Sequence, residues 1–109
     1  MAQTYKRLGA INPSANTQTN VYVVPAATEA VISTITVCNQ TASNASYSIA
    51  VAQDGAADAN TQYIIRGGVV PAADSIGITL GITLDAADVV RANTNQANVA
   101  FNIFGSEVA

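Results

Sequence analysis

Residues 74–90 read DSIGITLGITLDAADVV and contain ten residues of unbroken alternation. One parity holds Ile76, Ile78, Leu80, Ile82 and Leu84, and the other holds Ser75, Gly77, Thr79, Gly81 and Thr83. A period of two scatters apolar residues around a helix but gathers them on one face of a strand. The stretch therefore predicts a long strand with one buried face, whose other face is uncharged and built from very small side chains.

The rest of the chain reads as further strands separated by turn residues. The predicted strands, besides the one above, span residues 4–11, 21–25, 29–39, 47–53, 61–70, 87–93 and 97–107. Turn signals every 8 to 12 residues are typical of an all-β sandwich or barrel. We therefore expect an all-β fold: an antiparallel β-sandwich of about eight short strands, jelly-roll-like or immunoglobulin-like. We expect a single domain over residues 1–109, with residues 1–20 as a candidate extended N-terminal arm.

Charge is sparse along this chain. Of 109 residues, 10% are charged and half are apolar, and the net charge is −3. Disordered chains have the opposite composition, so we expect an ordered protein. The four basic residues, Lys6, Arg7, Arg66 and Arg91, are scattered. They form no patch that could neutralise phosphates or anionic lipid, and no apolar run is long enough for a membrane span. We therefore expect neither a nucleic-acid nor a membrane partner.

Catalytic and metal-binding residues are few. The chain has no histidine and one cysteine, which rules out Ser-His-Asp and Cys-His catalysis and an ordinary structural zinc site. Cys38 is expected to be a small buried or half-buried residue near a strand end. The seven acidic residues lie mostly in predicted turns, where Asp bonds to nearby backbone. We therefore expect no enzyme and no cofactor.

Two ligand-binding alternatives remain. The loop DGAADAN places Asp54, Asp58 and Asn60 together, and calcium takes oxygen ligands. Their spacing does not match an EF-hand loop, so we expect no metal site. A carbohydrate-binding module would need exposed aromatic faces, and the chain has no tryptophan. Only Tyr5 and Tyr63 are candidates for exposure, because Tyr22, Tyr47 and Phe101 fall on apolar parities and are expected in the core.

Two long segments carry a resemblance to a known family. They are NVYVVPAATEAVISTITVCNQTASNASYSIAV, which begins at residue 20, and GITLGITLDAADVVRANTNQANVAFNIFGSE, which ends at residue 107. Together they resemble small virion proteins of tailed bacteriophages, including cyanophages, in which a VYxVP strand leads into a strand ending in VCN and the chain ends near FGSE. The resemblance implies a structural role on the particle and no catalytic residues.

On this basis the expected function is that of a capsid decoration or cement protein, located in the virion and bound to the major capsid protein or another virion structural protein. A tail, baseplate or fibre-associated protein is the alternative within the class, and a small carbohydrate- or cell-surface-binding module is the alternative outside it. We expect a homo-oligomer, a trimer before a dimer. The candidate interface residues are Ser75, Gly77, Thr79, Gly81, Thr83, Tyr5, Lys6 and Arg7. Small residues let another backbone approach closely, although an ordinary solvated strand would also fit the pattern.

Overall fold

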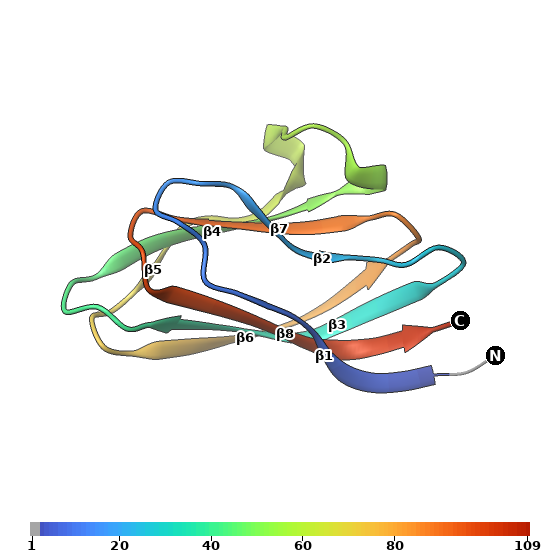
Figure 1. Ribbon diagram of the computed structural model, residues 1–109, viewed down its shortest axis with the longest axis horizontal. Coiled ribbons are helices and arrows are strands. Elements are labelled where there is room, and N and C mark those ends of the chain that lie inside the picture. The colour runs from blue at the N-terminus through green and yellow to red at the C-terminus, as the bar shows by residue number, and fades with distance from the viewer. Residues whose placement is uncertain (1–2) are drawn as a thin grey trace.

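The computed structural model describes residues 3–109 as two packed β-sheets (Figure 1). The strands are β1 (Gln3–Ile11), β2 (Thr19–Val23), β3 (Glu29–Asn39), β4 (Ala45–Ala52), β5 (Tyr63–Val70), β6 (Ser75–Leu84), β7 (Val89–Thr94) and β8 (Val99–Val108). Two single 3₁₀ turns, η1 (Gln53–Gly55) and η2 (Asn60–Gln62), lie between β4 and β5. The prediction of an all-β sandwich with eight strands is confirmed.

The strand order is that of a jelly roll. Sheet A has the order β1-β8-β3-β6 and sheet B the order β2-β7-β4-β5, and all neighbours are antiparallel. Every connection except β4–β5 passes from one sheet to the other, as in a chain wound into two Greek keys. The immunoglobulin alternative would instead place the first strand beside the second. Residues 3–11, from the segment considered as an N-terminal arm, form β1 and pair with β8, while residues 1–2 lie outside the described residues.

The core lies between the two sheets and is filled by the inward parity of each strand. Its largest fully buried side chains are Phe101, Ile32, Ile35, Ile49 and Ile103. Tyr22, Tyr47 and Phe101 are buried as predicted, and the rings of Tyr47 and Phe101 meet edge to face with centroids 6.3 Å apart. No helix among residues 3–109 has the length and apolar character needed to cross a membrane.

Sheet A is bent at the level of Phe104. The register of β3 shifts between Ile32 and Thr34 against both of its neighbours, and the register of β1 shifts between Arg7 and Gly9. Against β8 the extra residue is Ser33 in β3, which explains how Ile32 and Ile35, on opposite parities in the sequence, are both buried. Such bulges increase the local bend and twist of a sheet.

A buried asparagine joins two turns at one end of the sandwich. The side-chain amide of Asn39 donates to the carbonyl oxygens of Ser43, Val70 and Pro71, at 2.8–3.2 Å. Its carbonyl oxygen accepts from the backbone N–H and the hydroxyl of Thr41. Asn39 is 1% exposed, and these bonds satisfy a polar group that would otherwise be costly to bury.

Candidate interaction face on sheet A

The two segments singled out as a candidate interface lie on the same sheet, because β1 and β6 are the two edges of sheet A. The register places their residues in rows across the outer face. The rows are Tyr5–Ser106–Val31–Thr83, Arg7–Phe104–Thr34–Thr79 and Ala10–Asn102–Thr36–Gly77. Cross-strand partners point to the same side of a sheet, so this outer face is continuous from one edge to the other.

The small residues of β6 are open on this face. Ser75, Gly77, Thr79, Gly81 and Thr83 are all exposed, whereas the alternate residues are half-buried or buried. A Cβ added at Gly77 or at Gly81 would meet nothing within 4 Å. The face is therefore not covered by the second sheet or by any loop among the described residues.

An exposed apolar cluster lies at the bent end of the same face. Tyr5 is 78% exposed, Val31 39% and Phe104 38%, and the three surround the small, buried Ser106. Sequence reasoning identified Tyr5 but missed Val31 and Phe104. The signal for Phe104 was present, because it lies on the parity opposite to Phe101 and Ile103 in the same strand. Large apolar groups of this kind on a low-charge surface mark candidate interaction sites.

Lys6 does not belong to this outer face. Its ammonium lies 2.7 Å from a carboxylate oxygen of Glu107 on β8, and the other oxygen accepts a hydrogen bond from the Tyr22 hydroxyl on β2. The hydrogen bond from Lys6, with that from Tyr22, lowers the pKa of Glu107. Burial, and then the neighbouring carboxylate, raises the pKa of the Tyr22 phenol far above its ordinary value. The contact between the two sheets is the Tyr22–Glu107 hydrogen bond, and Lys6 supports it by pairing with the same carboxylate from within sheet A.

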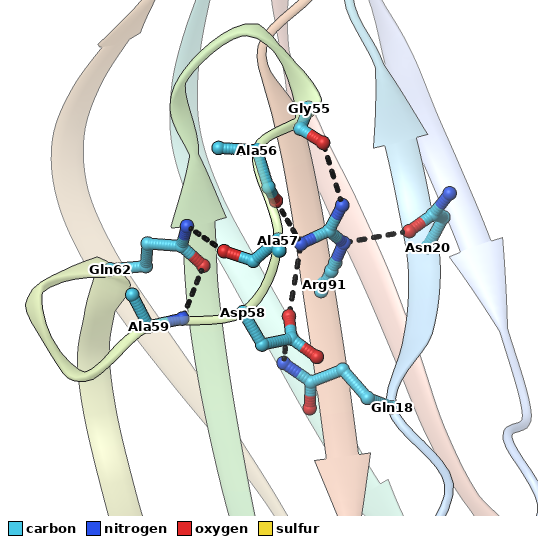
Figure 2. Close-up of polar contacts among 9 residues, drawn as sticks. All are labelled: Gln18, Asn20, Gly55, Ala56, Ala57, Asp58, Ala59, Gln62 and Arg91. Carbon is cyan, nitrogen blue, oxygen red and sulfur yellow. Dashed lines mark hydrogen bonds and ion pairs between the residues drawn. The ribbon is translucent and has the colours of Figure 1, made fainter.

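The outer face of sheet B is partly covered by the loop over residues 53–62, which an arginine on β7 holds in place (Figure 2). The Arg91 guanidinium donates to the backbone carbonyls of Gly55 and Ala56 and lies 2.9 Å from the Asp58 carboxylate. It also donates to the Asn20 side chain on β2. Figure 1 shows the same loop outside the layer of sheet B, so the two faces of the sandwich differ.

Two of the three residues considered as calcium ligands use their side-chain oxygens for other contacts. Asp58 pairs with Arg91, and the Asn60 side-chain oxygen accepts from Arg66 at 2.8 Å. Arg66 also lies over the Tyr63 ring, 4.6 Å from its centroid. Within residues 3–109, no three Asp, Glu, His or Cys side chains gather as a metal-binding group.

The prediction that the acidic residues form turns holds for Asp74, Asp85 and Asp88. It is wrong for Glu29 and Glu107, which lie in β3 and β8, and Asp58 pairs with Arg91 instead. Asp88 accepts from the backbone N–H groups of Asp54 and Asp85, and Asp74 accepts from that of Ser75. Cys38 is half-buried at the end of β3, as predicted.

One open depression of about 470 Å³ lies beside η1 and η2. It is lined by Val51, Gln53, Asp54, Ala56, Ala57, Ala59, Thr61 and Gln62. Its lining includes no aromatic side chain on which a sugar ring could stack and one titratable group, Asp54. This lining provides neither a sugar platform nor a pair of groups for acid–base chemistry.

Comparison with known proteins finds similarity among solved structures alone. No family model matches the chain, and no curated protein matches it. Among solved structures, a pentameric capsid protein isolated from metagenomic phage sequences aligns with 91% of this chain at 20% identity and a TM-score of 0.30. The chain spans 60% of the length of that protein. A TM-score of 0.30 is too low to establish a common fold.

Proposed function

We propose that this chain is a non-enzymatic structural protein of a phage virion, which decorates or cements the capsid by binding across neighbouring capsid subunits. The observation that carries the proposal is the outer face of sheet A. It runs across four strands, carries Arg7 as the one charged side chain in its three described rows, and ends in the apolar cluster of Tyr5, Val31 and Phe104.

The chemistry of this face suits stable docking. Gly, Ser and Thr side chains lose little conformational entropy when they are covered, and they let another backbone come close. The cores of protein interfaces are depleted of charge and enriched in aromatic residues, which supply most of the binding energy. The cluster of Tyr5, Val31 and Phe104 would be the anchor, and the small residues of β6 would supply a flat surface beside it.

The fold is compatible with this role, and the resemblance in sequence favours it. Jelly rolls occur in viral capsid proteins as well as in lectins and cupins, so the fold alone does not decide between them. The resemblance of residues 20–107 to small phage virion proteins favours a capsid role over that of a lectin or a cupin. On a shell, repeated contacts from each copy would raise the apparent affinity through effective concentration.

Quantitative mass spectrometry of purified particles, with heads separated from tails, tests the proposal. We expect the protein in the head fraction, at a fixed ratio to the major capsid protein. Recovery with tails alone would favour the tail, baseplate or fibre role. Absence from washed particles, together with binding of the isolated protein to glycans, would overturn the virion role and favour a carbohydrate-binding module.

A further inference from the structure

The free edge of β6 differs from the other three edges of the sandwich. Exposed strand edges invite pairing with other chains, and proteins protect them with charge, proline or short length. β1 carries Lys6 and Arg7, β5 carries Arg66, and β2 has five residues with Pro25 two positions beyond it. β6 has ten residues with no charge and no proline. Among the described strands, β6 is the one edge strand that is long and has neither a charged residue nor a proline to prevent pairing with another chain.

The inward side chains of β6 are incompletely covered. Ile76, Ile78 and Ile82 pack against the core cluster, yet they stay half-buried, and Leu80 is half-buried too. These aliphatic groups lie at the rim of the sandwich because no strand follows β6 in sheet A. A further strand on this edge would remove them from water, which is favourable by about 25 cal/mol for each Å² of apolar surface buried.

The sequence of β6 is a palindrome in residue type, centred on Thr79. On either side of Thr79 the chain places Ile78 and Leu80, then Gly77 and Gly81. Continuing outward, Ile76 corresponds to Ile82, and Ser75 corresponds to Thr83. A two-fold axis midway between two opposed Thr79 residues would therefore pair each side chain with one of its own kind. Self-complementarity of this form is what a two-fold interface requires.

We infer that β6 pairs antiparallel with β6 of a second copy, about a two-fold axis that passes midway between the two opposed Thr79 residues. The pairing joins two copies of sheet A into one eight-stranded sheet and forms roughly eight to ten main-chain hydrogen bonds. It places aliphatic residues against aliphatic residues on the core side. On the outer side it places glycine opposite glycine and hydroxyl opposite hydroxyl. The inference does not depend on a role in the virion.

The register shift between β3 and β6 does not interrupt the free edge of β6. The register between β3 and β6 shifts near Ser33, where Leu80 and Gly81 lie between the paired residues. Along β6 itself, however, exposed and half-buried residues alternate without a break from Ser75 to Thr83. The irregularity therefore affects the pairing with β3 and not the side-chain alternation that a new strand would meet.

Cysteine cross-linking tests the register of this pair. In a Cys38→Ser background, Thr79→Cys places two thiols directly opposite each other. Opposed Cα atoms lie about 4.5–5.5 Å apart in antiparallel pairs, within the range that a disulfide spans. We expect mild oxidation to yield a covalent dimer. The matched control is Ser75→Cys, because its two copies would lie about 27 Å apart along the strands. Mixed Gly77→Cys and Gly81→Cys chains should cross-link with each other.

A charge exchange provides the second test. Thr79→Lys alone and Thr79→Glu alone would each place like charges opposite each other and should sediment as monomers, whereas their mixture should form dimers. Thr36→Lys, on the same face but in the central strand β3, should leave the wild-type dimer intact. Circular dichroism checks that each variant is folded.

The inference is overturned by any of three results. One is a wild-type chain that stays monomeric throughout the micromolar range, and another is a trimer. The third is a dimer that neither Thr79→Lys nor Thr79→Glu affects. The first of these would point to an edge that accepts a strand from a different protein.

Discussion

The hydroxyl of Tyr22 on β2 donates a hydrogen bond to the carboxylate of Glu107 on β8, and this contact joins the two sheets of the sandwich. Lys6 on β1 completes the group by an ion pair with the same carboxylate. The Glu107 side chain is 15% exposed, so water screens these contacts less than it would at the surface. Three strands from two sheets therefore meet at one carboxylate.

Acid should weaken this junction. The pKa of Glu107 is lowered in the folded protein, so its stabilising effect is present above the ordinary glutamate pKa and is lost as the pH falls through the lowered value. Glu107→Gln should reduce the free energy of unfolding by about 1 kcal/mol at neutral pH. Urea unfolding from pH 7 to pH 3 should show the difference from wild type shrinking below about pH 5. A difference that stays constant with pH would contradict this account.

Two glycines of sheet A, Gly105 on β8 and Gly77 on β6, should respond in opposite ways to substitution by alanine. A Cβ at Gly105 would overlap the Val31 carbonyl oxygen, whereas a Cβ at Gly77 would meet nothing within 4 Å. Gly105→Ala should therefore destabilise the fold by about 3 kcal/mol. Gly77→Ala should be neutral or slightly stabilising, because glycine inside a strand costs about 0.5–1 kcal/mol relative to alanine. Thermal unfolding of both variants measures the contrast, and similar melting temperatures would refute it.

The strands were predictable from the sequence because alternation and turn residues are local signals. The strand over residues 29–39 and the alternation over 75–84 match β3 and β6 residue for residue. The strand order was not predictable, because six of the seven connections cross between sheets. In such a fold the hydrogen-bonded neighbours are mostly far apart in sequence. Local patterns say nothing about which strands meet.

The candidate interaction face could also be predicted only in part from the sequence. The sequence indicated the small face of β6 and the segment with Tyr5 and Arg7, and the fold brings these to the two edges of one sheet. Alternation alone places Lys6 on the face opposite to Tyr5 and Arg7, but its pairing with Glu107 depends on the register of β1 against β8 and could not be read from the sequence. Val31 was missed because the bulge in β3 reverses which parity faces the core.

Arg91 should control the order of the loop over residues 53–62. Arg91→Met keeps much of the side-chain volume but removes the bonds to Gly55, Ala56 and Asp58. Amide hydrogen exchange in residues 54–59 should become faster, while exchange in the strands of sheet A stays slow. Arg7→Met, on the other sheet, is the control and should leave the loop unchanged. Unaltered exchange in the loop of Arg91→Met would show that other contacts hold it.

Three turns contain an alanine in the left-handed region, and one of them offers a stabilising change. In PAAD at residues 71–74, Ala73 has φ of 54°, and the Asp74 N–H donates to the Pro71 carbonyl at 3.3 Å. Ala27 and Ala87 adopt the same conformation in related turns. Glycine takes positive φ without strain, so Ala73→Gly should stabilise the fold by about 0.5 kcal/mol.

The neighbouring Ala72→Gly serves as the control. Ala72 has no positive φ, so this change should destabilise by a similar amount through the added freedom of the unfolded chain. Denaturant melts of the two variants measure the signs. Destabilisation by both would show that Ala73 is not strained.

Rebinding to particles tests most directly whether the outer face of sheet A is the docking surface of a virion protein. Purified chain is added to particles stripped of it, and the bound fraction is measured by sedimentation. Phe104→Glu changes the apolar cluster on sheet A. The control, Val69→Glu, changes an exposed apolar position on β5 of sheet B, where Val69 is 59% exposed against 38% for Phe104. The account predicts saturable binding of the wild type and of Val69→Glu, with loss of binding by a folded Phe104→Glu. Wild-type binding by Phe104→Glu, or no binding of the wild-type chain to particles, would contradict it.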